Sequence, residues 1–373
     1  MQRKPRAPTR ATAPHGPARL DWLPPGASRG TAPPPWTSDG LLLFSHHSGL
    51  PWYVGELPGR WLAKHHGLAL TRANLASGPP TLRGIPADTR FYADTMASRM
   101  LAPVRDAIRA AGGHVLLSCD EEFWHLPPWI AVGPRFAEEV HRIERNLRAA
   151  DRVVVFSARM AERVTRFNRS ISVIPHALPP LAELPPPAGR RDRAGIRIGW
   201  AGSDGHRGDL EMIGPAVCEL LARRPDVTFV LAGQCHSVSW AQALRDSPQL
   251  DLHAGSVWLP AYYRWIASLD LDAFICPLVD HPFNQVKPAL KPLEAAGLGI
   301  PVLASAIGSY ADELRHEETA LLVTNTEAWL AALLRLVDDA DLRAHLSAGG
   351  RAWAATRTIE QTGDAWAKVW GAR

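Results

Sequence analysis

The sequence predicts an α/β protein built from two Rossmann-like, doubly wound domains that face a cleft. Short, unbroken apolar segments alternate with amphipathic stretches along most of the chain. Such segments are typical of a parallel sheet whose two faces are both covered by helices. A proline-rich stretch interrupts this alternation near the middle of the chain, and the same pattern then restarts. With 373 residues, the chain is long enough for two domains of ordinary size.

Residues 39–178 are expected to form the first domain. Its predicted strands are the apolar runs at residues 41–45, 114–118, 153–157 and 171–175. Helical stretches lie between them, most clearly at 136–149 and 158–167. The preceding residues 1–38 contain nine prolines and few aliphatic side chains, so we expect a disordered tail there because the segment cannot bury a core.

Residues 179–195 contain five prolines and a cluster of arginines, which predicts a stiff, polar linker. The second domain is then expected at residues 196–373. Its predicted strands are 196–201, 227–232, 250–253, 273–277, 301–304 and 320–323, and its predicted helices include 209–224, 260–269, 288–298 and 327–337. The last helix is a candidate to cross back to the first domain. Open α/β sheets bind ligands beyond the carboxyl ends of their strands, so a ligand is expected in the cleft between the two domains.

Composition excludes several classes of partner. The 41 basic residues are nearly balanced by 37 acidic ones and are spread along the chain, which argues against a nucleic-acid partner. No apolar run approaches the ~20 residues of a membrane-spanning helix, and no secretory leader is visible. We therefore expect a cytoplasmic protein, with peripheral contact to the inner face of the membrane left open. The four cysteines lack metal-ligand spacing, so we expect no metal site, and the sequence does not predict an oligomeric state.

A glycine-rich loop, GWAGSDGHRG at 199–208, follows one predicted strand and precedes a helix. Its glycines allow backbone N–H groups to approach an anion, and the following helix offers its positive end. The spacing matches neither the dinucleotide fingerprint nor the P-loop. Candidate anion-binding residues are Gly202, Ser203, His206 and Arg207. The alternative is a tight turn that exposes polar side chains.

A second candidate is the segment NQVKPALKPLE, which runs from Asn284 to Glu294. Lys287 and Lys291 are spaced i, i+4 and would share one face of a helix that begins at Pro288. The chain has only five lysines, so two in one short motif are informative. Two cations followed by a carboxylate suit a diphosphate joined to a ribose. The alternative is an exposed helix face with salt bridges.

The first domain offers its own polar residues at predicted strand ends. Asp120 and Glu121 lie in CDEEFW, directly after the strand at 114–118, and could bind hydroxyl groups or act as a base. His46 and His47 follow the first strand, and His176 follows the last strand before the linker. The alternatives are a solvated acidic loop and structural histidines.

Taken as an ordered set, the segments GWAGSDGHRGDL, HPFNQVKPALKPLEAAGLGIPVLAS and GSYADELRHEETALLV resemble the family-4-type glycosyltransferases (glycosyl transferases group 1), which have the GT-B fold. HSGLPWYVGELPGRWLAKHHGL and ISVIPHAL resemble the first loop and the strand before the linker in that family. The resemblance implies that Arg207 stands where the family has a lysine that binds the donor diphosphate. It also implies that Val257, in the loop 255–259, lies beside the nucleobase.

The same resemblance places Lys287 and Lys291 at the donor phosphates and Glu294 on the ribose. Glu294 matches the second glutamate of the family's E-x7-E motif, whereas Val286 stands in place of the first. Asn284 or Lys287 is the candidate to replace that missing carboxylate. On the acceptor side, His46, His47, Asp120 and Glu121 are the candidate catalytic residues.

The resemblance implies a glycosyltransferase that moves a sugar from a nucleotide-diphosphate sugar to a glycan, lipid or small-molecule acceptor. Retention at the anomeric carbon is expected, and neither a metal nor a further cofactor is expected. Two alternatives stay open: a non-catalytic two-lobed binder or degenerate transferase, and an epimerase of the same fold that acts on the nucleotide sugar itself.

Overall fold

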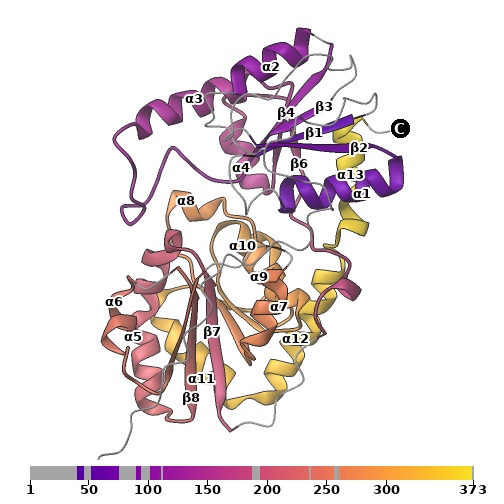
Figure 1. Ribbon diagram of the computed structural model, residues 1–373. Helices are drawn as coiled ribbons and strands as arrows, with labels where there is room; N and C mark the ends of the chain where they lie inside the picture. Colours follow the sequence, from indigo (N-terminus) through magenta and orange to yellow (C-terminus); the bar gives the residue numbers. More distant parts are fainter. Residues whose placement is uncertain are drawn as a thin grey trace, which may run out of the picture.

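A computed structural model gives the structure of most of the chain. It describes residues 40–45, 52–74, 90–93, 101–110, 112–186, 194–234, 237–255, 259 and 261–371. The predicted tail at 1–38, His46 and His47, and Val257 lie outside the described residues. The described chain forms two α/β units arranged one above the other (Figure 1).

The first sheet contains six parallel strands. They are β1 (Gly40–Ser45), β2 (Ala69–Asn74), β3 (Arg90–Ala93), β4 (His114–Cys119), β5 (Arg152–Val155) and β6 (Ile171–Val173). Their order is β2-β1-β3-β4-β5-β6, with Leu117 opposite Val153 across β4 and β5. The strand order changes direction between β1 and β3, as in flavodoxin-like sheets.

The second sheet is also parallel and six-stranded. Its strands are β7 (Ile196–Gly202), β8 (Val227–Gly233), β9 (Leu250–Ala254), β10 (Ala273–Cys276), β11 (Val302–Ser305) and β12 (Leu321–Val323). The order β12-β11-β10-β7-β8-β9 is that of the Rossmann fold, whose switch point here lies between β7 and β10. Strands β10 and β11 are buried along their whole length, which confirms the prediction of parallel sheets covered on both faces.

Helices surround both sheets (Figure 1). Those of the first domain are α1 (Leu57–His66), α2 (Leu101–Ala110), α3 (Phe136–Ala149) and α4 (Ala158–Val164), with a π-helical turn at Trp52–Glu56 before α1. The later helices are α5 (Arg207–Arg223), α6 (Ser239–Ala243), α7 (Ala261–Ser268), α8 (Pro282–Gln285), α9 (Leu290–Gly297), α10 (Gly308–Glu313), α11 (Trp329–Asp338), α12 (Ala340–Ala355) and α13 (Ile359–Trp370), and 3₁₀ turns form at Leu181–Glu183, Asp204–His206 and Thr326–Ala328. Side-chain caps fix some helix starts: the Ser157 hydroxyl accepts from the backbone N–H of Met160 at the start of α4.

The structure differs from the sequence prediction at two kinds of position. Strands β2 and β3 were not predicted, because β2 has a mixed polar sequence at the edge of the sheet and β3 has only four residues. Helix α9 begins at Leu290 and not directly after Lys287, so the prediction that Lys287 and Lys291 share a helix face is wrong. This start leaves Pro292 in the first turn, where a missing backbone N–H breaks no hydrogen bond.

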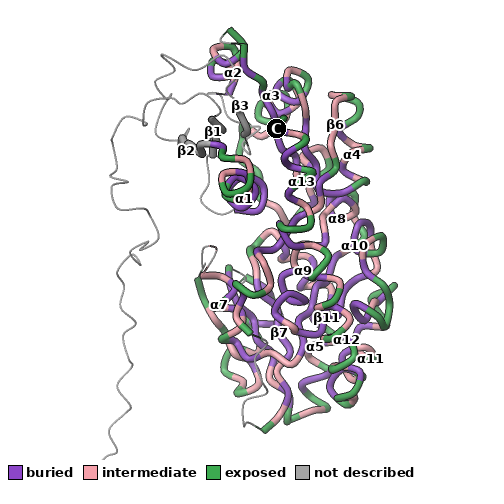
Figure 2. The backbone as a smooth tube through the Cα atoms, turned by 90° about the vertical axis from the view of Figure 1, so that its right-hand side faces the viewer, coloured by how far each residue is buried: buried purple, intermediate pink, exposed green. Residues whose placement is uncertain are grey.

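The last helix of the chain makes apolar contacts with the first unit. Helix α13 returns to the first unit and packs against α1 (Figure 1). The contact is close because Gly363 lies against the Trp61 ring, which a Cβ atom at this position would approach within 2.3 Å. Trp366 and Trp370 are buried in this region. One hydrophobic cluster joins these tryptophans to Leu293 of α9 and Phe274 of the second sheet, and Figure 2 shows buried residues in each of these parts.

The described part of the proline-rich segment packs on the second unit. Leu178 and Leu184 are buried against Gly297 of α9. The backbone N–H of Leu178 donates to the carbonyl of Arg357, and the N–H of Ile359 donates to the carbonyl of Leu178. Residues 178–184 therefore lie against the final helices and do not span open solvent.

Candidate active site between the two sheets

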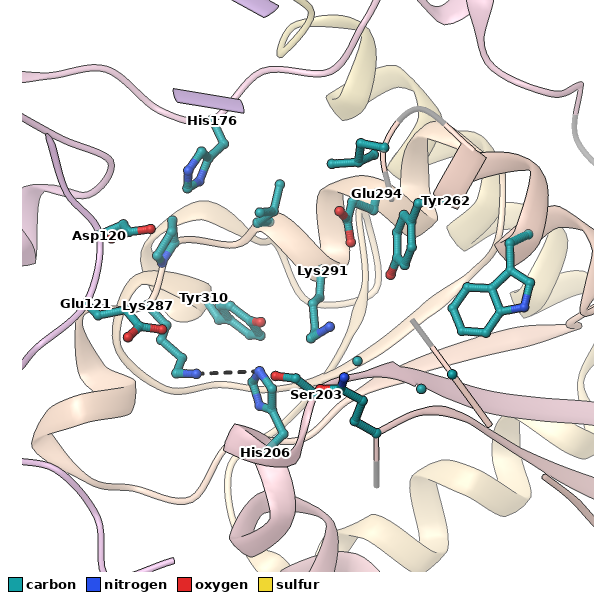
Figure 3. Close-up of a pocket in the computed structure, with 18 residues that line it drawn as sticks. Asp120, Glu121, His176, Ser203, His206, Tyr262, Lys287, Lys291, Glu294 and Tyr310 are labelled. Carbon is teal, nitrogen blue, oxygen red and sulfur yellow. Dashed lines mark hydrogen bonds between the residues drawn. The ribbon is translucent and has the colours of Figure 1, made fainter. Parts of the chain in front are cut away.

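A cavity of about 360 Å³ lies between the two units, at the carboxyl ends of the second sheet's strands (Figure 3). Gly202, Gly233 and Gly255, at or just beyond the ends of β7, β8 and β9, form one wall. The first unit contributes Asp120 and Glu121, from the segment that follows β4. The cavity therefore lies where open α/β sheets hold their ligands.

The ammonium group of Lys291 binds at the carboxyl end of β7. Its Nζ donates to the carbonyl of Ala201 over 2.7 Å and lies 5.1 Å from the centre of the Trp200 ring. A Cβ atom at Gly202 would lie 2.6 Å from that Nζ, so this close approach depends on glycine. Ser203, the next residue, also lines the cavity. The loop after β7 and the Lys291 ammonium together form a cationic, donor-rich surface suited to an anion.

The buried carboxylate of Asp209 binds His206, and His206 in turn lies next to Lys287. Asp209 is fully buried, and its Oδ2 accepts a hydrogen bond from the Nδ1–H of His206 over 2.8 Å. Its Oδ1 accepts from the backbone N–H of Val279 and from Nδ2 of Asn284, both at 2.8 Å. Because Nδ1 carries the proton of a neutral ring, Nε2 of His206 is left as an acceptor, and Lys287 Nζ lies 3.5 Å from it.

The protonation states in this cluster follow from burial and charge. Burial, together with the nearby Lys287 ammonium, lowers the pKa of His206 to about 4, although its hydrogen bond to Asp209 acts in the opposite direction. The imidazole is therefore neutral at pH 7. Burial also lowers the pKa of Lys287, and the carboxylates of Glu121 and Asp209 oppose that change.

Glu294 lies at the other end of the cavity and is bonded by tyrosines. The Tyr53 hydroxyl, from the first unit, donates to its Oε1 over 2.5 Å and lies 2.8 Å from the Tyr263 hydroxyl. Tyr262 lies beside the same carboxyl group (Figure 3) and acts to lower its pKa. Burial raises the pKa of Glu294, while Lys291 and the tyrosine hydrogen bonds oppose the rise. This carboxyl group can accept hydrogen bonds from the hydroxyl groups of a ligand.

The acidic segment after β4 divides between two roles. Asp120 and Glu121 line the cavity. Glu122 is fully buried instead, where its Oε2 lies 3.4 Å from Nε of Arg163 and its Oε1 accepts from the backbone N–H of Trp124. Two of the three carboxylates thus face the ligand space, and the third holds the segment in place.

The other predicted site residues lie around the cavity but do not all line it. Ser203, His206, Lys287 and Lys291 line it, as does Glu294 (Figure 3).

Asn284 is buried against Asp209, behind the cavity wall. Arg207 donates from Nη2 to the carbonyl of Trp129 over 3.3 Å, at the contact between the two units. His46, His47 and Val257 lie outside the described residues, so their predicted roles stay predictions.

Several residues of the site were not predicted, among them Tyr53, Asp209 and Trp129. Tyr53 and Asp209 lie in segments that resemble the family, but no role was assigned to either side chain. Trp129 reaches from the first unit onto the glycine-rich loop, where its Nε1–H donates to the carbonyl of Gly205 over 3.2 Å and its ring covers Gly208. A tryptophan that follows two prolines carries no sequence signal for such a contact.

Two parallel sheets of these topologies, with a ligand cavity between them, define the GT-B class of fold. Solved structures agree with this assignment. A sucrose-phosphate synthase from Thermosynechococcus elongatus superposes with a TM-score of 0.66 at 17% identity, covering 89% of this chain and 98% of that one. Anabaena HepE, in a complex with UDP, superposes with a TM-score of 0.64 at 13% identity, covering 90% of this chain and 100% of that one.

Sequence comparison finds a match to a known family in the second unit. Residues 196–339 match the family model of glycosyl transferases group 1. A 115-residue stretch is 33% identical to the D-inositol 3-phosphate glycosyltransferase of Salinispora arenicola, covering 30% of this chain and 23% of that relative. The second unit of this GT-B protein is therefore similar to the group 1 glycosyltransferases, which confirms the resemblance found in the sequence. Within the described residues, no helix combines the length and apolarity needed to cross a membrane.

Proposed function

We propose that this protein transfers a glycosyl residue from a nucleotide-diphosphate sugar to the hydroxyl group of an acceptor. The observation that carries the proposal is the arrangement of Lys287, Lys291 and Glu294 along one cavity at the switch point of the second sheet. Two ammonium groups suit a diphosphate, and the carboxyl group at the far end suits the hydroxyl groups of a ribose. The match of this unit to the group 1 glycosyltransferases supports the same donor class.

The lysines would stabilise the diphosphate as it leaves the sugar. As the glycosidic bond to the diphosphate breaks, negative charge develops on the β-phosphate. Lys287, Lys291 and the backbone N–H groups of the loop after β7 would stabilise that charge, because they are already oriented before the reaction. They supply the positive charge that a metal ion supplies elsewhere, so we expect activity to persist in the presence of a chelator.

The acceptor is proposed to enter from the first unit. Asp120 and Glu121 line the cavity on the same side as Lys287 (Figure 3), where either carboxylate could orient an acceptor hydroxyl or receive its proton. Val286 is buried and bonded through its carbonyl to the Ser157 hydroxyl, so this position offers no carboxylate to the reaction. Retention at the anomeric carbon, as the family resemblance implies, is part of the proposal.

A nucleotide panel tests the donor site. Thermal unfolding would be followed with UDP, GDP, dTDP, ADP and CMP on the wild type and on Glu294→Ala. A ligand at 100 times its dissociation constant stabilises the folded state by about 2.7 kcal/mol. UDP is the first candidate because HepE was solved with it. We expect one diphosphate to stabilise the wild type, Glu294→Ala to lose most of that effect, and Glu327→Ala, on the exposed turn before α11, to keep it.

Turnover then separates the proposed transferase from the alternatives. The glucose conjugate of the stabilising nucleotide is incubated with the protein, with and without candidate acceptor sugars, and the released diphosphate is quantified. Acceptor-dependent release supports the transferase. Binding without any release would indicate a non-catalytic binder, and a changed sugar on an intact nucleotide would indicate an epimerase. Failure of every nucleotide to bind would overturn the proposal.

A further inference from the structure

His176 is a buried polar residue whose ring nitrogens have no protein partner in the part of the chain that the structure describes. Its side chain is 5% exposed and lines the cavity. Neither Nδ1 nor Nε2 forms a hydrogen bond to any described residue. Buried side-chain nitrogens are normally paired, since an unpaired one forfeits hydrogen bonds to water. Two unpaired nitrogens on a ring at a ligand cavity therefore indicate that a ligand supplies the partners.

The His176 ring is held in place by aromatic packing. It stacks on Phe156 with ring centres 4.3 Å apart and an interplanar angle of 8°. Tyr53 contacts it edge-on, at 5.8 Å between centres. These contacts fix the plane of the imidazole without using either nitrogen. Figure 3 shows the ring directed into the cavity from above, on the same side as Asp120.

The position of His176 relative to the other groups identifies the part of the ligand it meets. Tyr262 and Glu294 lie together at one end of the cavity, the proposed ribose end (Figure 3). Lys291 and Lys287 follow across the middle, where the diphosphate is proposed. His176 reaches the cavity from the first unit, beside Asp120, and lies across it from the loop that carries Ser203 and His206 (Figure 3). A ligand whose diphosphate lies on the lysines and on that loop would therefore turn its next group toward His176. In a nucleotide sugar, the group beyond the diphosphate is the glycosyl ring.

We propose that His176 binds the glycosyl ring of the nucleotide sugar, donating a hydrogen bond to one hydroxyl oxygen and accepting one from a hydroxyl group. The inference rests on the proposed function and names a specificity-determining residue within it. Burial lowers the pKa of His176 to about 3, so the ring is neutral at pH 7 and offers one donor and one acceptor. A ring this weakly basic positions the sugar and does not act as a general base.

The test compares one ligand with and without its sugar. Affinities for UDP and for UDP-glucose are measured by calorimetry on the wild type and on His176→Phe, which keeps the aromatic stack on Phe156 and removes both nitrogens. We expect the affinity of His176→Phe for UDP-glucose to fall five- to hundredfold, as for two lost hydrogen bonds, while its affinity for UDP changes less than twofold. His176→Asn, which keeps a donor and an acceptor, should recover part of the loss.

Two further measurements separate binding from folding. His65→Phe changes a histidine that stacks on Trp61 in α1 and does not line the cavity, so both affinities should stay unchanged. His176→Phe should unfold at the same temperature as the wild type or higher, because it removes two unpaired buried nitrogens. Equal losses for UDP and UDP-glucose, or no loss for either, would overturn the inference while leaving the proposed function standing. A wild type that binds none of the nucleotides UDP, GDP, dTDP, ADP and CMP, and none of their sugar conjugates, would count against both.

Discussion

The buried, neutral His176 predicts a specific loss of stability in acid. The ordinary pKa of 6.5 applies in the unfolded chain, whereas burial lowers the pKa in the folded protein to about 3. The unfolded state therefore binds a proton in the pH range between these values and the folded state does not, so protonation favours unfolding. This contribution to stability is complete above pH 6.5 and is lost progressively as the pH falls toward 3.

The magnitude follows from the 1.36 kcal/mol that corresponds to one pKa unit. Between pH 7.5 and pH 5, the protonation of His176 in the unfolded state removes about 2 kcal/mol of unfolding free energy. His176→Phe has no imidazole to protonate at this position, so its unfolding free energy does not fall by this amount. All other titrating groups, including His206, are common to both proteins and cancel in the difference.

The assay is urea denaturation of the wild type and His176→Phe at pH 7.5 and pH 5, followed by tryptophan fluorescence. We expect acidification to cost the wild type about 2 kcal/mol more unfolding free energy than it costs the variant. Equal losses in the two proteins would show that the pKa of His176 is the same in the folded and the unfolded state. That result would refute the argument that burial keeps its ring neutral.

Three further predictions test the site and its surroundings. Lys291→Met should weaken nucleoside diphosphate binding ten- to hundredfold in calorimetry, because a charge-assisted hydrogen bond is worth about 1.5–3 kcal/mol; Lys64→Met, on α1, should leave it unchanged. Gly208→Ala places a Cβ atom 2.2 Å from the Trp129 ring and should lower turnover more than nucleotide affinity, since the clash lies between the units; equal effects would contradict this. Arg159→Ala removes an ion pair to Asp312 whose side chains are 39% and 48% exposed, so denaturation should show a loss of at most about 1 kcal/mol that high salt abolishes.

Much of the second sheet could be predicted because its strands are short, unbroken apolar runs. The run at 196–201 became β7, and 273–277 became β10, since both faces of each strand are covered. The edge strand β2 escaped prediction because its sequence, ALTRAN, mixes polar and apolar side chains. The pattern thus predicts central strands better than edge strands.

The candidate site was predictable where its residues are close in sequence. Lys287, Lys291 and Glu294 were assigned to one site from their spacing, and they share one cavity even though Lys287 lies before the helix. The hydrogen bond from Tyr53 to Glu294 joins residues 241 positions apart, and no local pattern indicates it. His176 was a candidate only because it follows a predicted strand. Nothing in the sequence shows that its ring nitrogens are buried without hydrogen-bond partners among the described residues.

The placement of the donor ribose at Glu294 is tested most directly by a calorimetric comparison of UDP with its 2′,3′-dideoxy analogue on the wild type and on Glu294→Gln. Gln keeps the size of the side chain and an acceptor for Tyr53 but removes the charge. We expect the wild type to bind UDP at least tenfold more tightly than the analogue, and Glu294→Gln to lose most of that preference, because hydrogen bonds to a charged group are worth about 1.5–3 kcal/mol. Undiminished discrimination in the variant, or equal binding of the two ligands by the wild type, would contradict the placement of the donor ribose at Glu294.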